Sequence, residues 1–244
     1  MHLTWLDPHN DNQPFPHPDR ALTEPDGLLA AGGNLTPRRL LRAYRMGIFP
    51  WYSADQPILW WSPDPRLVLL PECLKVSRSL RKTLRKRVFT ITADTAFEQV
   101  VAACAGPRQG EPGTWITSEM YRAYCRLHRL GHAHSIETWQ QGELVGGLYG
   151  VALGQVFYGE SMFSWISDAS KIALVALTAQ LQRWEFAVID CQVTTTHLLS
   201  MGAVDIPRSS FLQLLERYCP QPGQPGPWRL DADLLDSLFA GARP

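Results

Sequence analysis

The chain has 244 residues, 45% of them hydrophobic, enough for one large domain with a smaller companion and a substantial core. Its 23 basic and 23 acidic residues balance, and a zero net charge by itself argues against a nucleic-acid partner. No apolar run reaches the roughly 18 residues of a membrane span, and the start lacks the features of a signal peptide, so we expect a cytoplasmic protein without a membrane partner.

The first 66 residues are rich in Pro, Gly and Trp, and this composition indicates a small domain, residues 1–66, packed against a larger one. One clear helix is expected within it, from Arg38 to about Met46. Thr36 is the expected N-cap, and Pro37 suits the first helical position, where its missing N–H costs no hydrogen bond.

From residue 67 onward helices and strands alternate, and we assign this part to a second domain, residues 67–244. Helices are predicted over 77–85, 96–105, 118–130, 168–184 and 197–201. Strands are predicted over 67–70, 88–92, 132–139, 144–152, 155–158 and 186–192. A meander of antiparallel hairpins followed by a helix and a further strand is the order of a GNAT-like N-acyltransferase. The predicted fold class is therefore mixed α/β (α+β) with a GNAT-like C-terminal domain.

One segment, residues 75–87, concentrates positive charge and contains no acid. Its seven cations are Lys75, Arg78, Arg81, Lys82, Arg85, Lys86 and Arg87. On a helix Arg78, Lys82 and Arg85 share one face. Such a run can be a solvated surface helix, but the absence of acidic residues favours contacts to the phosphates of a nucleic acid.

Two polar sites stand out in otherwise apolar surroundings. Glu160 lies among Met, Phe and small residues, and a partly buried carboxylate needs a cationic partner, either an internal Arg or a substrate cation. Asp190 and Gln192 end an apolar strand and point to one face, while Cys191 points to the other. The pair is either a functional site or a structural hydrogen-bonded pair.

Aromatic residues form a further group, with Trp51, Tyr52, Trp60, Trp61, Trp115 and Tyr124 as members. They can fill an interdomain core or offer a stacking platform for an unpaired nucleotide. The five cysteines form no Cys-x-x-Cys pair and the seven histidines no His-Glu-x-x-His pattern. We therefore expect free thiols, no metal and no cofactor.

Eight motifs together resemble the bacterial leucyl/phenylalanyl-tRNA–protein transferases, over residues 15–211. They are GLLA (27–30), GIFPW (47–51), LWWSPDPR (59–66), GTWIT (113–117), HAHSIE (132–137), VGGLYGV (145–151), GESMFS (159–164) and IDCQ (189–192). The resemblance implies a GNAT-like enzyme that transfers Leu, Phe or, less readily, Met from aminoacyl-tRNA to proteins beginning with Arg or Lys. These proteins are thereby marked for N-end rule degradation.

The resemblance also assigns residues. An apolar pocket for the aminoacyl side chain would include Leu148, Phe157 and Met162. The terminal adenosine and the nearby cleft would be surrounded by Trp51, Trp115, Tyr44 and Tyr124. Glu160, Asp190 and Gln192 would face the acceptor peptide. In this assignment Asp190 orients Gln192 and balances the developing ammonium, Gln192 holds the attacking amine by its carbonyl oxygen, and Glu160 favours a basic first residue.

Two other functions compete with this interpretation. An acyl-CoA-dependent N-acyltransferase usually carries a Gly-rich pyrophosphate loop, whereas the link from Tyr158 to the helix at Asp168 contains only Gly159. A non-enzymatic RNA-binding module would use the basic segment and the aromatics, but it leaves the polar strand end at Asp190 and Gln192 unexplained.

Overall fold

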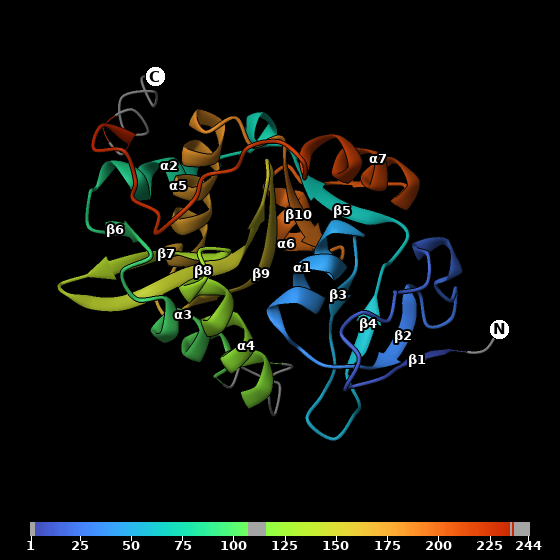
Figure 1. Cartoon of the computed structure of the whole chain (residues 1–244). Coiled ribbons are helices and arrows are strands. Elements are labelled where there is room, and N and C mark those ends of the chain that lie inside the picture. The colour runs from blue at the N-terminus through green and yellow to red at the C-terminus, as the bar shows by residue number, and fades with distance from the viewer. Residues whose placement is uncertain (1–2, 107–115, 235, 237–244) are drawn as a thin grey trace.

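The computed structural model describes residues 3–106, 116–234 and 236 (Figure 1). The described N-terminal part contains a four-stranded sheet in the order β1-β2-β4-β3. Its strands are β1 Thr4–Leu6, β2 Leu28–Gly32, β3 Phe49–Pro50 and β4 Leu59–Trp61. The sequence analysis predicted none of them, because strands of two to five residues between turns are too short to show an alternating pattern.

The larger part contains a seven-stranded sheet in the order β11-β5-β10-β9-β8-β7-β6. Its strands are β5 Arg66–Leu69, β6 Thr90–Ala93, β7 Ala133–Gln140, β8 Glu143–Leu153, β9 Val156–Ser164, β10 Val188–Gln192 and β11 Val204–Ile206. Strands β7, β8 and β9 form the expected antiparallel meander, and β10 returns parallel to β9. The mixed α/β fold class is confirmed, as is the predicted order of a meander followed by a helix and a further strand.

Helices cover both faces of this sheet (Figure 1). The helices are α1 Pro37–Arg45, α2 Arg78–Arg85, α3 Phe97–Cys104, α4 Ser118–Arg129, α5 Ala169–Arg183, α6 Thr196–Ser200 and α7 Arg208–Tyr218. Helices α3 and α4 belong to one hydrophobic cluster, while α2 and α5 belong to a second cluster. A strand sends alternate side chains to opposite faces, so β8 and β9 contribute to both clusters.

Helix starts agree well with the sequence. The side chain of Thr36 accepts a hydrogen bond from the backbone N–H of Arg39, and Pro37 is the first residue of α1, as predicted. Asp168 precedes α5 as predicted, but its side chain makes no capping bond. It accepts hydrogen bonds from Thr83 and Lys171 instead, and its φ of 70° turns the backbone into the helix.

Strand β9 is longer than predicted. The sequence analysis ended it at Tyr158, but pairing with β8 continues to Ser164. A register shift accommodates Glu160 as an extra residue between Gly159 and Ser161, and the polar and small residues of this stretch hid the strand pattern. Strand β11 and helix α7 were also not predicted.

The two sheets share one hydrophobic cluster that includes Trp60 and Phe211. Helix α7 packs on the turn at Gly47, whose φ is +70° and where an added Cβ would meet Leu212, Phe211 and Leu215 at 3.0–3.3 Å. The chain leaves the small sheet at Trp61 and enters the large one at Arg66. We keep the division into 1–66 and 67–244 as a proposal.

After α7 the chain runs back along one end of the large sheet (Figure 1). We call residues 220–234 the C-terminal strap. Position Gly223 lies against Gly154 in the β8–β9 turn, and Trp228 N–H donates to Asp94 at the end of β6. The strap then reaches α5, where Arg183 pairs with Asp231. None of the described helices is long and apolar enough to cross a membrane.

Candidate active site

The candidate site lies where strands β9 and β10 stop pairing. The two strands run parallel, and their last registered pair is Asp190 with Tyr158. Strand β9 then continues along β8 to Ser164, whereas β10 ends at Gln192. The sheet therefore opens between the two strands.

Local irregularities aim polar side chains into this opening. Glu160 is the extra residue in the β8–β9 register, and a second register shift separates Asp190 from Gln192 on β10. Gln192 has a φ of 65°, a left-handed conformation that is rare for a residue with a side chain. Bulges and strained positions of this kind concentrate at functional sites, where they redirect a side chain.

The opening holds a cavity of about 450 Å³. Its apolar walls include Leu148, Phe157, Met162, Leu174, Leu177, Ile189 and Cys191. Its polar groups include Glu160, Ser161, Gln192, Thr195 and His197, and Phe49, Pro50, Trp51 and Leu198 also belong to the lining. The cavity thus combines an apolar wall with a small number of polar groups, as ligand sites commonly do.

Glu160 is buried and bound entirely by uncharged donors. Its Oε1 accepts from the Tyr44 hydroxyl at 2.8 Å and from Gln192 Nε2 at 2.9 Å, and its Oε2 accepts from the Tyr124 hydroxyl. Burial raises the pKa of Glu160 to about 7, because the hydrogen bonds that favour the charged form offset the lost hydration only in part. The carboxyl group therefore titrates near neutral pH.

The same network fixes the amide of Gln192. Its Nε2 donates to Glu160, so its carbonyl oxygen points away from Glu160. Within the part of the chain that the structure describes, no donor is bonded to that oxygen. The side-chain carbonyl oxygen of Gln192 is thus a hydrogen-bond acceptor on the cavity wall that is available to an N–H group of a ligand.

Asp190 lies deeper and is fully paired. Arg66 Nε and Nη2 donate to its two oxygens at 2.8 and 2.6 Å, and both side chains are almost completely inaccessible. Asp190 Oδ1 also accepts the backbone N–H of Gln192 at 2.9 Å. The expected coupling of Asp190 and Gln192 therefore exists, but through the backbone of Gln192.

The ion pair also corrects the role that the sequence suggested for Asp190. Both of its oxygens are bound by Arg66, and Asp190 is not among the residues that line the cavity. A charge that is already neutralised and screened from the cavity cannot balance an ammonium group there. Asp190 therefore lies outside the cavity lining, where it accepts the backbone N–H of Gln192.

The positions of Tyr44 and Tyr124 also differ from the expectation. They were expected to surround an adenosine, but both rings are buried; their hydroxyl oxygens lie 2.8 Å apart, and both hydroxyl groups donate to Glu160. Burial and the charge of Glu160 raise the pKa of both hydroxyls well above 10, so they remain donors. They support Glu160 from within the core.

Other predicted residues lie at the cavity itself. Leu148, Phe157 and Met162 line its apolar wall, and Trp51 lies at its edge with 42% of its surface exposed. The ring of Trp51 packs at 5.8 Å from Trp61, whose Nε1 donates to the backbone oxygen of Trp51. Trp115, predicted for the same cleft, lies outside the described residues.

The basic segment forms helix α2 as predicted, with Ser77 as its N-cap. All seven cations are exposed, while Leu80 and Leu84 face the core. One of the seven, Arg87, pairs with Asp236 at 3.3 Å, a counter-ion far away in sequence. Two hydrogen bonds connect the segment to neighbouring helices. The backbone N–H of Lys75 donates to the backbone oxygen of Met201, just after α6, and the Thr83 hydroxyl donates to Asp168, just before α5.

Several site residues were not predicted. Arg66 gave a weak signal because a lone Arg beside Pro is common on surfaces, and its partner is 124 residues away. Leu174 and Leu177 of α5 also lie on the cavity wall. That helix is buried on almost every side, so periodicity cannot single out one face.

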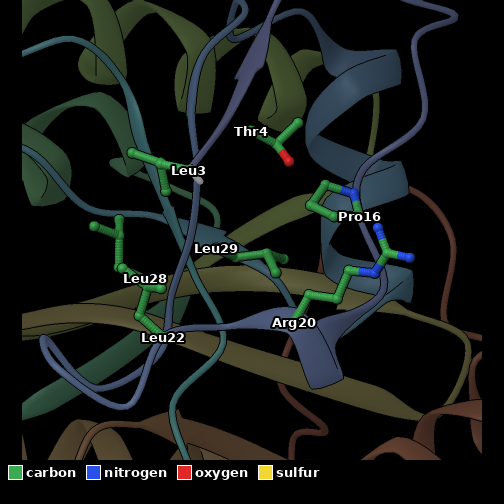
Figure 2. A pocket seen from close by; sticks show the side chains of 7 residues that line it. All are labelled: Leu3, Thr4, Pro16, Arg20, Leu22, Leu28 and Leu29. Carbon is green, nitrogen blue, oxygen red and sulfur yellow. The ribbon is translucent and has the colours of Figure 1, made fainter. Parts of the chain in front are cut away.

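A second cavity lies in the N-terminal part (Figure 2). Figure 2 shows its lining, which consists of Leu3, Thr4, Pro16, Arg20, Leu22, Leu28 and Leu29. The lining contains no carboxyl group, histidine or thiol. The chemistry of proton or acyl transfer therefore favours the cavity between β9 and β10.

The matching family models and the relatives most similar in sequence carry the name of one family. The family model described as leucyl/phenylalanyl-tRNA protein transferase matches residues 68–216, and the model of its N-terminal domain matches residues 33–64. The leucyl/phenylalanyl-tRNA–protein transferase of Aromatoleum aromaticum is 60% identical, over 93% of this chain and 94% of that protein. The Methylococcus capsulatus protein of the same name is 56% identical, over 93% and 97%. A GCN5-related N-acetyltransferase structure from Kribbella flavida matches at a TM-score of 0.32 with 13% identity, over 69% of this chain and 60% of that one.

Proposed function

We propose, from the premise that this chain belongs to the leucyl/phenylalanyl-tRNA protein transferase family, that it transfers Leu, Phe and less readily Met. The donor is the corresponding aminoacyl-tRNA, and the acceptor is the α-amine of a protein that begins with Arg or Lys. The extended protein is thereby marked for N-end rule degradation in the cytoplasm. Membership of the family makes the chain an aminoacyltransferase that uses tRNA and acts on proteins.

One observation carries the proposal, namely that a single cavity contains both an apolar wall and a buried carboxyl group with a free amide acceptor beside it. The apolar wall suits the side chain of the transferred residue. Leu, Phe and Met are unbranched at Cβ, whereas Val and Ile carry a branch next to the reacting carbonyl. Glu160 and Gln192 then lie where the acceptor would enter.

The reaction is the aminolysis of an ester. The α-amine nitrogen bonds to the carbonyl carbon, the bond from that carbon to the ribose oxygen breaks, and a proton passes from nitrogen to the ribose oxygen. The unperturbed pKa of an α-amine is roughly 7.7–8.0, so a neutral fraction exists near pH 7. The protein has to orient that neutral amine against the carbonyl carbon.

Gln192 would orient the neutral α-amine, because the carbonyl oxygen of its side chain can accept a hydrogen bond from an N–H of the amine. An amide is too weak a base to remove the proton, so Gln192 orients the amine and the ribose oxygen receives the proton. The bond from Gln192 N–H to Asp190, and that of Asp190 to Arg66, hold the residue in its left-handed conformation.

Glu160 accounts for the preference for a basic first residue. Its three hydrogen-bond donors are uncharged, so the only positive charge it would meet on binding is that of the acceptor. A guanidinium or ammonium group nearby lowers the pKa of a carboxyl group and favours its charged form. An acceptor that begins with a neutral residue gains nothing from this carboxyl group.

The tRNA body would lie along α2. Six of the seven cations in the basic segment 75–87, which contains α2, have no ion-pair partner among the described acidic groups; the exception is Arg87. The segment contacts α6 and the start of α5, and α6 contributes His197 and Leu198 to the cavity. Phosphates bound along α2 would thus place the charged end of the tRNA near the opening.

The direct test is incubation of the protein with Leu-tRNA and a peptide that begins with Arg. A Leu-extended product is expected, with much less product from the same peptide beginning with Ala. Lauroyl-CoA or leucyl-CoA replaces the tRNA in a parallel reaction and should give none. A product from the CoA donor alone would favour the acyl-CoA-dependent enzyme, and binding of tRNA without product would favour the RNA-binding module.

A second experiment tests the tRNA surface. Changing Arg78, Lys82 and Arg85 to Glu should raise KM for charged tRNA and flatten its salt dependence, because fewer phosphates are neutralised. Reaction with a minimal aminoacyl-adenosine donor should change little. A matched control makes the same charge changes at Arg122, Arg126 and Arg129 of α4, on the other face of the sheet. Equal losses with both donors would contradict the proposed surface.

A further inference from the structure

The C-terminal strap contains a buried tryptophan whose position bears on the cavity. Trp228 is 2% exposed, although it lies in a segment without regular secondary structure. The strap follows residue 216, where the family match ends, so neither matched region includes it. A loop that buries its largest side chain orders that segment at an entropic cost, and burial of the ring offsets this cost.

Trp228 is held in one orientation by several contacts. Its backbone N–H donates to Asp94 at 2.6 Å, and its Nε1 donates to the backbone oxygen of Gln224 at 3.1 Å. Its ring stacks on His134 with a centroid distance of 3.9 Å and an interplanar angle of 1°. Trp184 and Phe186 meet the ring edge-on at 5.0 and 6.0 Å.

The remaining ring contact of Trp228 is with Phe157, at a centroid distance of 5.8 Å. Phe157 lines the cavity, whereas Trp228 does not, so Phe157 separates Trp228 from the cavity. The Phe157 ring also lies against Gly150 on β8, where an added Cβ would lie 2.5 Å from the ring. A residue without a side chain and a tryptophan from the strap thus both contact this part of the cavity wall.

We infer that Trp228 is a positioning residue that fixes the depth of the apolar end of the cavity by preventing Phe157 from moving outward. This inference rests on the proposed function, because depth matters only if the cavity receives the side chain of the transferred residue. The backbone at Gly150 is held in place by the packed sheet. The Phe157 ring can therefore move more easily toward the strap than toward Gly150. The C-terminal strap is then a part of the specificity site.

The experiment measures kcat/KM for Phe-tRNA and Leu-tRNA with the Trp228→Ala protein and an Arg-starting peptide. Removing the indole leaves room for the Phe157 ring to move back, which favours the larger side chain. The ratio of Phe to Leu transfer should rise about tenfold, the discrimination that small changes in an apolar pocket produce. Tyr-tRNA should also become a detectable donor. Trp228→Phe should give a smaller shift in the same direction.

Two controls separate this role from a loss of stability. Trp139→Ala removes a half-buried tryptophan from the other hydrophobic cluster, so it should lower Tm without changing the ratio. In a Phe157→Ala background the Trp228→Ala change should no longer shift the ratio, because Trp228 acts through Phe157. If Trp228→Ala does not fold, Trp228→Leu replaces it.

A folded Trp228→Ala or Trp228→Leu protein with the native ratio would overturn the inference, as would a shift that persists without Phe157. Native protein that transfers neither Leu nor Phe from tRNA would instead remove the proposed function, and the inference with it. The two failures are distinguishable because the first leaves the native reaction intact.

Discussion

Two buried carboxyl groups lie on neighbouring strands, and their surroundings are opposite. Asp190 on β10 has a bidentate ion pair with Arg66, which also donates to Gly47 O and lies over the ring of Phe49 at 4.8 Å. Glu160 on β9 accepts from two tyrosine hydroxyls and one amide, all of them neutral. The first carboxylate carries its counter-charge within the fold, and the second does not.

This difference distinguishes a carboxylate that stabilises the fold, Asp190, from a carboxyl group that can interact with a ligand, Glu160. A buried ion pair with both partners present contributes to the frame of the fold, and it leaves no charge for a ligand. A buried carboxyl group with neutral donors keeps a pKa near 7 and can be charged by an approaching cation. Four predictions test whether the two groups differ in this way.

The largest effect is expected at Arg66. Changing Arg66 to Met leaves Asp190 buried without a cation, which should lower the free energy of unfolding by about 3–5 kcal/mol. The double variant with Asp190→Asn should recover much of this loss because both charges are gone. Urea unfolding at pH 7.5 measures the difference. The exposed Arg38→Met change is the control and should stay within about 0.5 kcal/mol of the native protein. A mild effect of Arg66→Met alone would refute the structural role.

The next largest effect is expected at Gln192. Gln192→Ala removes the proposed acceptor for the amine and should lower kcat about 100-fold, in the range typical of a lost positioning contact. The Kd for charged tRNA should not change, since Gln192 does not contact α2. Single-turnover kinetics and tRNA binding measure the two effects. A folded Gln192→Ala protein with native kcat would exclude this residue from the reaction.

Stability should depend on pH through Glu160. Its pKa rises from 4.5 to about 7 on folding, so the folded state favours the protonated form. The resulting stabilisation is complete below pH 4.5 and is lost as pH rises through 7. Relative to Glu160→Gln, the native protein should lose about 2–3 kcal/mol between pH 5 and pH 8. Chemical denaturation at both pH values measures this, and a constant difference between the two proteins would contradict it.

The smallest effect is expected at Tyr44. Tyr44→Phe removes a hydrogen bond that lowers the pKa of Glu160, so the charged form appears only at higher pH. The acid limb of the kcat/KM profile for an Arg-starting peptide should move upward, with activity at pH 6.5 about threefold lower, as one hydrogen bond of roughly 0.5–1.5 kcal/mol implies. Tyr52→Phe, which removes a hydroxyl near Glu119, should leave the limb in place.

Long, periodic and well-capped elements of this chain are determined by local sequence. Helix α1 starts at Pro37 after a Thr36 cap, as predicted, and α2 starts at Arg78, one residue after the predicted start at Ser77. The meander of β7, β8 and β9 was predicted from turns and alternation. The short strands of the small sheet and the second half of β9 escaped prediction, because long-range pairing and a bulge, rather than local pattern, stabilise them.

The chemically unusual residues Glu160, Asp190 and Gln192 and the basic segment could be identified from the sequence. Their partners depend on the tertiary fold. Arg66 is 124 residues from Asp190, and Tyr44 is 116 residues from Glu160. Pairing across such separations depends on sheet order and register, and these are set by burial of the whole core and not by any local pattern.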